Sequence, residues 1–222
     1  ILSSNAIMAE PCNPALGECS SFHHNHANSD LGTSGYGGAL YLNESNLVLN
    51  ANHLHHNSAY LGGAIYQTGT TSASEVTNSL LHHNSTQDSA GAAIRVNQGA
   101  FTLYHVTLAD NSGAPAYSAA SGSFNEINNS IAWGNTDGFS GIFAGNLCNI
   151  DQSANVGSNL NPLFIDASAM DYHLRIGSPA IDACPVGLTP DLDNHIRPLG
   201  MQYDMGAYES PIFRIYLPFI LR

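Results

Sequence analysis

The chain has 222 residues, of which 43% are hydrophobic and 10% are charged, with no lysine, five arginines and a net charge of −12. Such an acidic chain lacks the basic surface that nucleic acids and anionic membranes require, and no apolar run is long enough to span a bilayer. The low charge, the abundant Asn, Ser, Thr and Gly residues and the four cysteines favour an exported protein, located outside the cell or on its surface.

Residues 1–18 are expected to form an N-terminal disulfide loop and the beginning of a first coil. Their first residues have the pattern of a strand and a turn, which predicts a processed or trimmed chain. The four cysteines allow more than one pairing, and the simplest joins Cys12 to Cys19 and Cys148 to Cys184. Zinc ligation is the rival, but the sequence contains no C-x-x-C spacing.

Residues 19–146 repeat one pattern, in which a Gly-Gly-Ala or similar turn leads to short apolar runs and a closing asparagine. The closing residues are spaced 32, 27, 27 and 24 positions apart, at Asn25, Asn57, Asn84, Asn111 and Asn135. A fixed period of this length indicates stacked supersecondary units. Glycine and asparagine interrupt every candidate helix, so we predict an all-β fold, a right-handed single-stranded parallel β-helix with three short strands in each coil.

A parallel β-helix places equivalent side chains directly above one another, about 4.8 Å apart. The closing asparagines should therefore form an amide ladder at one turn, while Leu54, Leu81 and Leu108 stack inside as an aliphatic column. The Gly-Gly-Ala positions mark a second turn, where glycine permits a positive φ.

Histidines concentrate just before the ladder. Alternation from the inward leucines predicts that His23, His55 and His82 point outward, while the next column leans toward the turn and consists of His24, His56, His83 and Asp110. Stacked imidazoles can bind a divalent metal, through His24, His56 and His83, but a metal-free ladder of polar rings is the favoured interpretation. Protonation near a pKa of about 6.5 should then weaken the body of the protein.

Residues 147–210 depart from the repeat and should form a last coil and an irregular cap. The series Asp171–Ala183, Asp191–Pro198 and Tyr203–Glu209 resembles the C-terminal region of secreted bacterial right-handed parallel β-helix proteins of the choice-of-anchor Q type. The coil pattern is similar to the repeats of polymorphic membrane proteins. The family pattern has glycine where this chain has Asn194, which puts a calcium-like loop in doubt.

Two roles remain open for the acidic residues of this region. Asp191 and Asp193, with Asp204 and Glu209, are candidates to hold one Ca²⁺ ion, since carboxylate oxygens are the ligands that this cation prefers. The favoured alternative is a structural cluster in which Asp191 and Asp193 surround Arg197 and cap the last coil.

Residues 211–222 form the most apolar run of the chain and are expected to make a terminal strand. An exposed strand of this kind is an aggregation hazard unless it docks in its own coil wall or in another copy. The tail resembles the terminal segments of related surface proteins, which implies an anchoring or assembly role. The candidate assembly residues are Phe213, Ile215, Tyr216, Leu217, Phe219, Ile220 and Leu221.

The sequence favours a scaffold over an enzyme. Parallel β-helices include polysaccharide lyases and hydrolases, which need a base beside carboxylates or clustered aspartates. In the repeats the only cation is Arg95 and the carboxylates are scattered. We therefore expect a non-enzymatic structural or adhesive protein that stacks on itself head to tail or donates its tail strand.

The alternative is a protein that binds or degrades polysaccharides, with cell-surface glycans as partners. Outward aromatic side chains in a row are typical of sugar binding, and the candidates are Tyr36, Tyr41, Tyr60, Tyr66 and Tyr104. Their spread over different turns favours a packing role for most of them.

Overall fold

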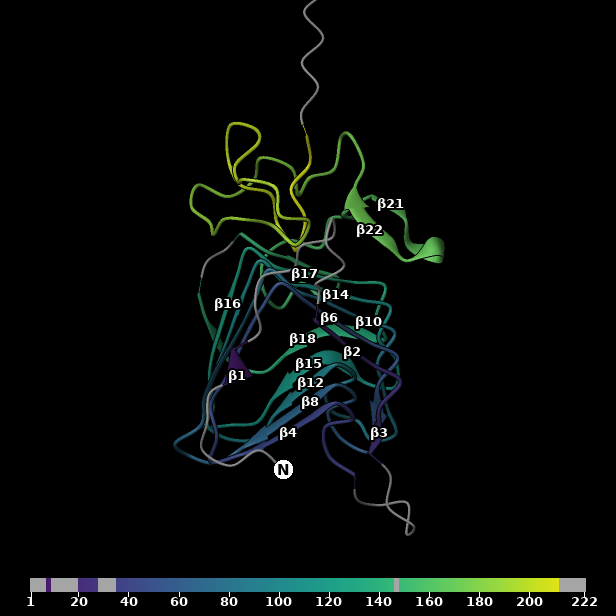
Figure 1. The fold of residues 1–222 in the computed structure, drawn as a ribbon, viewed down its shortest axis with the longest axis vertical. Coiled ribbons are helices and arrows are strands. Elements are labelled where there is room, and N and C mark those ends of the chain that lie inside the picture. The colour runs from purple at the N-terminus through teal and green to yellow at the C-terminus, as the bar shows by residue number, and fades with distance from the viewer. Residues whose placement is uncertain (1–6, 9–19, 28–34, 146–147, 212–222) are drawn as a thin grey trace, which may run out of the picture.

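A computed structural model describes residues 7–8, 20–27, 35–145 and 148–211 (Figure 1). It confirms the predicted all-β fold, a parallel β-helix of stacked coils. Cys12, Cys19 and the assembly residues of the tail lie outside the described residues, so the Cys12–Cys19 pairing stays a prediction.

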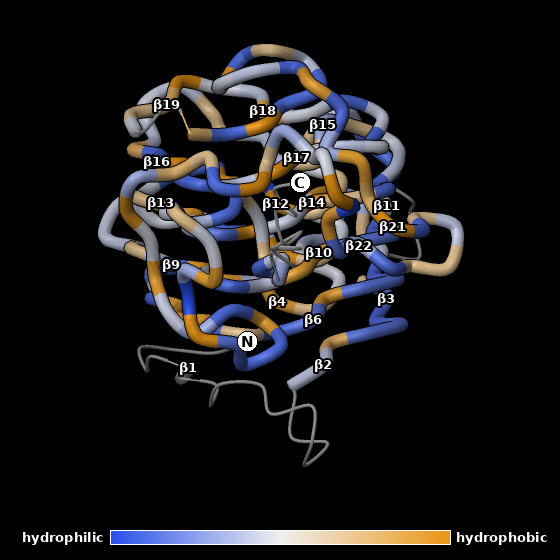
Figure 2. Tube along the Cα trace, turned by 90° about the horizontal axis from the view of Figure 1, so that it is seen from above, coloured by the Kyte–Doolittle hydropathy of each residue, from blue (hydrophilic) through white to orange (hydrophobic). Residues whose placement is uncertain are grey.

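Three parallel sheets form the walls of the solenoid (Figures 1 and 2). The histidine wall has six strands: β2 (Ser20–His23), β6 (Asn52–His55), β10 (Leu80–His82), β14 (Thr107–Ala109), β17 (Ile131–Trp133) and β20 (Ile150–Asp151). The tyrosine wall has five: β4 (Leu40–Asn43), β8 (Ile65–Thr68), β12 (Ile94–Val96), β15 (Pro115–Ala119) and β18 (Asp137–Ser140). The third wall has six: β1 (Ile7–Met8), β5 (Leu47–Asn50), β9 (Ala73–Thr77), β13 (Ala100–Tyr104), β16 (Phe124–Asn128) and β19 (Phe143–Ala144).

Smaller elements complete the fold. A narrow parallel sheet after the asparagine turn contains β3 (His26–Ala27), β7 (Ser58–Ala59) and β11 (Ser85–Thr86). An antiparallel pair, β21 (Phe164–Asp166) and β22 (Asp171–Leu174), encloses a 3-10 helix at Ala167–Ala169. No described helix has the length and apolar character of a membrane span.

The core follows from alternation along each strand. Leu81 pairs in register with Leu54 and Leu108 in the neighbouring coils, and all three side chains are fully buried. On the tyrosine wall, Ile65 and Ile94 stack inside in the same way. A single core cluster therefore runs along the axis, and the predicted leucine column is confirmed.

The five asparagines lie in one ladder beside this core. The side-chain amide of Asn57 donates to Asn84 Oδ1 at 3.0 Å, and that of Asn84 donates to Asn111 Oδ1 at 3.0 Å. At the two ends of the ladder, the amide of Asn25 donates to Asn57 Oδ1 at 2.9 Å, and the amide of Asn111 donates to Asn135 Oδ1 at 2.8 Å. Each rung can join the next because an amide carries both a donor and an acceptor.

Two corners of each coil require unusual backbone angles. His24, His56, His83 and Asp110 precede the ladder with φ between 52° and 56°. Such angles are unfavourable for residues with a Cβ, and the ladder hydrogen bonds offset this cost. At the other turn Gly62 has a φ of 65°, and a Cβ there would lie 2.3 Å from the carbonyl oxygen of Ile65, so glycine is required.

Residues 151–156 close the C-terminal end of the solenoid. Asn155 donates its amide to the carbonyl oxygen of Phe139 in the edge strand β18, and Val156 packs against the core. Gln152 exchanges two hydrogen bonds with the backbone of Asn135, which extends the asparagine ladder by one rung. The end of the stack is thus covered by the segment that directly follows β20.

The expectation that the acidic cluster caps the last coil is corrected. The C-terminal segment, residues 160–211, lies along the outer face of the histidine wall (Figure 1). Ala207 donates its backbone N–H to Thr107 of β14, and the Asn129 side chain donates to the carbonyl oxygen of Val186. The physical reason is an apolar outer face, since Leu80, Ile131 and Ile150 occupy outward positions that need cover.

The predicted disulfide between Cys148 and Cys184 is confirmed, with a Cα–Cα distance of 5.7 Å. It joins the last coil to the C-terminal segment, and both cysteines lie in an apolar cluster with Ile131 and Ile150. The bridge therefore fixes the segment against the wall that it covers.

Replacing Asn84 by alanine should lower the thermal unfolding midpoint by roughly 4–8 °C, because the change removes a ladder rung and leaves buried polar partners unpaired, at about 2 kcal/mol. Asn43→Ala, at an exposed position of β4, is the matched control and should shift the midpoint by no more than about 2 °C. The midpoints are measured by circular dichroism. Equal midpoints for the two variants would show that the ladder does not stabilise the stack.

Candidate functional site

Three groups of polar and aromatic side chains stand out in the described residues. One is the histidine array on the histidine wall, and the second is a buried cluster around Arg197 in the C-terminal segment. The third is the outer face of the tyrosine wall, with Tyr36, Tyr41, Tyr66 and Arg95.

The histidine array consists of two columns of three stacked rings. Equivalent rings in adjacent coils lie 5.0–5.1 Å apart between centroids, along His23, His55 and His82 and along His24, His56 and His83. Within each coil the two Nδ1 atoms face each other at 2.9–3.0 Å. Such a contact is a hydrogen bond only if one Nδ1 carries a proton and the other does not, so the array favours neutral rings.

The environment holds these imidazoles in the neutral form. Burial and neighbouring imidazoles lower the pKa of His55 to about 4 and that of His82 to about 3. The pKa values of His53 and His56 are also lowered, mainly by burial. His82 faces outward, as alternation predicts, but it is only 5% exposed because Tyr172 of the C-terminal segment covers its ring at 5.3 Å between centroids.

The metal sites considered from the sequence are corrected. The rings of His24, His56 and His83 stack face to face, so their in-plane nitrogens do not converge on one point. Asp191 accepts from the backbone of His195 and Glu209, whereas Asp193 contacts His173, so the two aspartates have different partners. Within the described residues no group of three or more His, Cys, Asp or Glu side chains is arranged as metal ligands.

Polar contacts fasten the C-terminal segment to the edge of the array. The Tyr172 hydroxyl donates to Asp110 Oδ2 at 2.7 Å, at the top of the second histidine column. His173 contacts Asp193 through Nε2 and Asp171 through Nδ1, both at 2.6 Å. The hydrogen bond with Asp193 is the largest cause that raises the pKa of His173 to about 9. Because both ring nitrogens are occupied, this histidine acts as a positively charged clamp.

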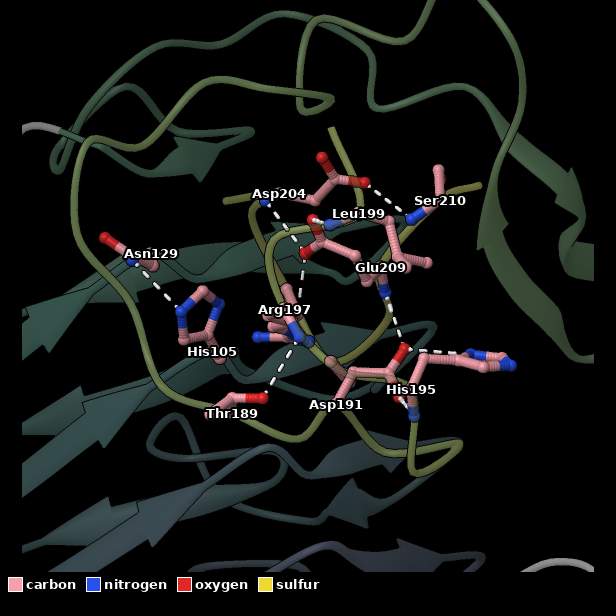
Figure 3. A network of polar contacts seen from close by, with 12 residues as sticks. His105, Asn129, Thr189, Asp191, His195, Arg197, Leu199, Asp204, Glu209 and Ser210 are labelled. Atoms are coloured by element: carbon pink, nitrogen blue, oxygen red, sulfur yellow. Dashed lines mark hydrogen bonds and ion pairs between the residues drawn. The ribbon is translucent and has the colours of Figure 1, made fainter. Parts of the chain in front are cut away.

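Arg197 is the centre of the second group (Figure 3). Its side chain is fully buried, donates to the carbonyl oxygen of Gly206 at 3.0 Å and lies 3.5 Å from Glu209 Oε2. Burial lowers the pKa of Arg197, and the negative charges of Asp191, Glu209 and Asp204 oppose this by favouring its protonated form. A guanidinium thus occupies the position for which a calcium ion was considered.

The remaining groups of the cluster respond to burial and charge. Burial, followed by the charge of Asp204, raises the pKa of Glu209 to about 7. Burial and then Arg197 lower the pKa of His105 to about 2, and Asn129 lies 3.1 Å from its ring (Figure 3). All these groups contact the wall or one another, so the cluster holds the C-terminal segment in place.

The third group faces outward from the tyrosine wall. Tyr41, Tyr66, Arg95, Ser118 and Ser140 are paired in register from β4 to β18 and form one outward column. Tyr36 joins the column from the preceding turn, with its ring 4.8 Å from Tyr66 and 6.1 Å from Tyr41. The three rings cover one another: Tyr36 is 39% exposed, whereas Tyr66 is 9% exposed.

The structure thus gathers three of the five tyrosines considered for sugar binding. Tyr104 lies instead against His105, 5.1 Å between ring centroids, and Tyr60 follows β7 near the asparagine turn. Sequence reasoning missed Tyr172 and His105, which join the C-terminal segment to the histidine wall, and His173, which links Asp171 to Asp193 within the segment. The change from Ser21 and His53 to Leu80 and Ile131 along one outward column was the available signal that this wall is covered.

Comparisons with protein-family models, curated proteins and solved structures give no match. The resemblance to choice-of-anchor Q proteins and to polymorphic membrane protein repeats therefore stays a prediction.

Acidification should destabilise the protein between about pH 6.5 and about pH 4. In the unfolded chain the histidines bind protons near pH 6.5. In the folded protein His55 and His82 remain neutral until about pH 4 and about pH 3. Between these pH values the chain takes up protons when it unfolds, so a fall in pH favours the unfolded state. Urea unfolding at a series of pH values should show a smaller acid-side loss for the double variant His55→Asn/His82→Asn.

His26→Asn, which removes an exposed histidine outside the two columns, is the control and should keep the wild-type slope. The raised pKa of Glu209 has the opposite effect, because acidification then favours the folded state. Since Glu209 is present in all variants, the difference between their pH curves reports on the array alone. Parallel pH curves for the wild type and the double variant would contradict this role of the array.

Proposed function

We propose that this chain is a non-enzymatic β-helix protein that works outside the cell or on its surface as a structural or adhesive protein. The observation that carries the proposal is the outward row of Tyr36, Tyr41, Tyr66 and Arg95. These residues belong to a wall other than the one that the C-terminal segment covers. A rigid wall with aromatic rings and one cation is suited to surface contact.

The placement of the other polar groups supports a scaffold. The histidine array, His173 and Arg197 make their contacts with one another, with the wall and with the C-terminal segment. These contacts stabilise the covered wall. Of the two other walls, the tyrosine wall carries the row of aromatic rings with Arg95, and it is therefore the proposed binding surface.

Binding is favoured over cleavage on the tyrosine wall. A lyase needs its base beside carboxylates that hold a cation, but the register neighbours of Arg95 are Tyr66 and Ser118. Neither neighbour is a carboxylate. This arrangement is compatible with holding a polymer without breaking its glycosidic bonds.

Self-association is proposed on a separate observation, an apolar hollow of about 660 Å³ at the end of the C-terminal segment. Its lining includes Ile165, Leu174, Ile176 and Pro211, and Ile176 is 86% exposed. Pro211 is directly followed in sequence by the apolar residues 212–222. We propose that the hollow receives this apolar segment from a second copy.

Adhesion is tested by co-sedimentation of the purified protein with insoluble extracellular polysaccharides and with cell envelopes. The protein should sediment with at least one of these polymers, while chromatography of the supernatant shows no release of oligosaccharides. Sedimentation with none of them would refute the adhesive role, and release of oligosaccharides would favour the polysaccharide-degrading alternative.

Self-association is tested by sedimentation velocity over a range of concentrations. The full chain should form oligomers, whereas a chain that ends at Pro211 and the full-length variant Ile176→Asp should remain monomeric, because each loses one side of an apolar contact. Ile142→Asp, at an exposed position outside the hollow, is the matched control. Oligomers of the same size in the truncated chain would rule out the tail as the contact.

A further inference from the structure

We infer that Tyr36, Tyr41, Tyr66 and Arg95 form a binding site for an acidic oligosaccharide, a glycan whose sugars carry carboxylates. The inference rests on the proposed adhesive function and names the chemical class of the ligand. The tyrosine rings would contact the sugar, and the guanidinium of Arg95 would favour a sugar that carries a negative charge.

The tyrosine rings form a stack that spans adjacent coils, here called the platform, in which Tyr36 is 39% exposed and Tyr66 only 9%. Tyr41 and Tyr66 lie 5.7 Å apart between centroids with an interplanar angle of 22°, and Tyr36 lies against both. Tyr36 is therefore the ring most accessible to a sugar, whose positively polarised C–H groups are attracted by the negative face of an aromatic ring. Because Tyr41 and Tyr66 occupy successive strands, the platform is oriented along the axis of the solenoid.

Arg95 sets the charge of the ligand. Its Nη1 donates to the Ser118 hydroxyl at 2.9 Å, and no described carboxylate forms an ion pair with it. The side chain is half-buried beside Tyr66, whose pKa is raised by burial and by Tyr36, while the positive charge of Arg95 opposes this rise. In a chain of net charge −12, a guanidinium without a carboxylate partner among the described residues is a site for an external anion.

Hydroxyl and amide groups flank the platform. Asn43 and Thr68 pair in register on β4 and β8, two residues after Tyr41 and Tyr66, and therefore point to the same outer face. Asn97 continues this second column, and its amide lies 3.4 Å from the Thr68 hydroxyl. Amides and hydroxyls both donate and accept hydrogen bonds, which suits the hydroxyl groups of a sugar. The tyrosine column thus offers stacking, and the neighbouring column of Asn43, Thr68 and Asn97 offers hydrogen bonds, the two kinds of contact that a carbohydrate needs.

The ligand class follows from the combination. A neutral glycan would use the rings and amides but not Arg95, and a small inorganic anion would use Arg95 but not the rings. An acidic peptide would pair with Arg95, but it has no need of the tyrosine rings. A carboxylate-bearing sugar uses all of these groups.

The test is titration calorimetry of the full chain with short oligogalacturonate and with the same oligomer after methyl esterification of its carboxylates. The acidic oligomer should bind at least about tenfold more tightly, and the difference should shrink in high salt. Arg95→Gln should lower affinity for the acidic oligomer about tenfold, to the level of the ester, and leave ester binding unchanged. Tyr36→Ala should weaken binding of both oligomers.

Two variants are matched controls. Arg175→Gln removes the same charge in the C-terminal segment, and Phe124→Ala removes an aromatic ring that is 78% exposed on the third wall. Both should bind like the wild type. Tyr66 is left unchanged because its burial would make a loss of binding ambiguous with a loss of packing.

Equal affinity of the wild type for the two oligomers, absence of binding to either, or wild-type affinity of Arg95→Gln for the acidic oligomer would overturn the inference. If the protein still sediments with polysaccharides in any of these cases, the adhesive function stands and only the site or ligand class is wrong. If it sediments with none, both fail together.

Discussion

The repeat along the solenoid axis places each side chain about one strand spacing from its equivalents in the neighbouring coils. Groups that interact favourably with copies of themselves can therefore form continuous columns. Amides do so because each is both donor and acceptor, as in the ladder from Asn25 to Asn135. Leucines do so through packing. Charged groups do not, and Glu75 and Glu126 are accordingly separated in their column by Thr102.

The histidine columns are intermediate between these cases. An imidazole can stack and can share a proton with its neighbour, but only while most of the rings are neutral. The described structure enforces this condition by burial, most strongly at His82 beneath Tyr172. The same segment that buries His82 brings a charged histidine, His173, which is held between two aspartates rather than in a column. Charge is thus permitted where its partners come from outside the repeat.

This distinction explains how much the sequence could predict. The ladder, the leucine column and the β-helix follow from a period that is visible in the chain, since neighbouring coils obey one register. The Cys148–Cys184 bridge follows from the simplest pairing of the four cysteines, and the structure confirms it. The position of residues 160–211 has no such period, so a cap at the end of the stack was a reasonable and wrong expectation. The burial of His82 could not be predicted for the same reason, because it depends on a residue 90 positions away in sequence.

The tyrosines lie on different turns of the chain, which predicts that they are spread apart, yet the fold brings three of them into contact. Tyr41 and Tyr66 are 25 residues apart in sequence and adjacent in register. The column then continues with Arg95 and Ser118 rather than with further rings.

Packing does not require a cation at this position, since Ser118 and Ser140 occupy the same outward column in later coils. A guanidinium that interrupts a column without a described carboxylate partner is the feature that the proposed acidic ligand would use. Because the column runs along the axis, a linear polymer lying parallel to that axis would meet the rings first and the charge one coil later. The order of side chains in the column would therefore set the direction in which the polymer is held.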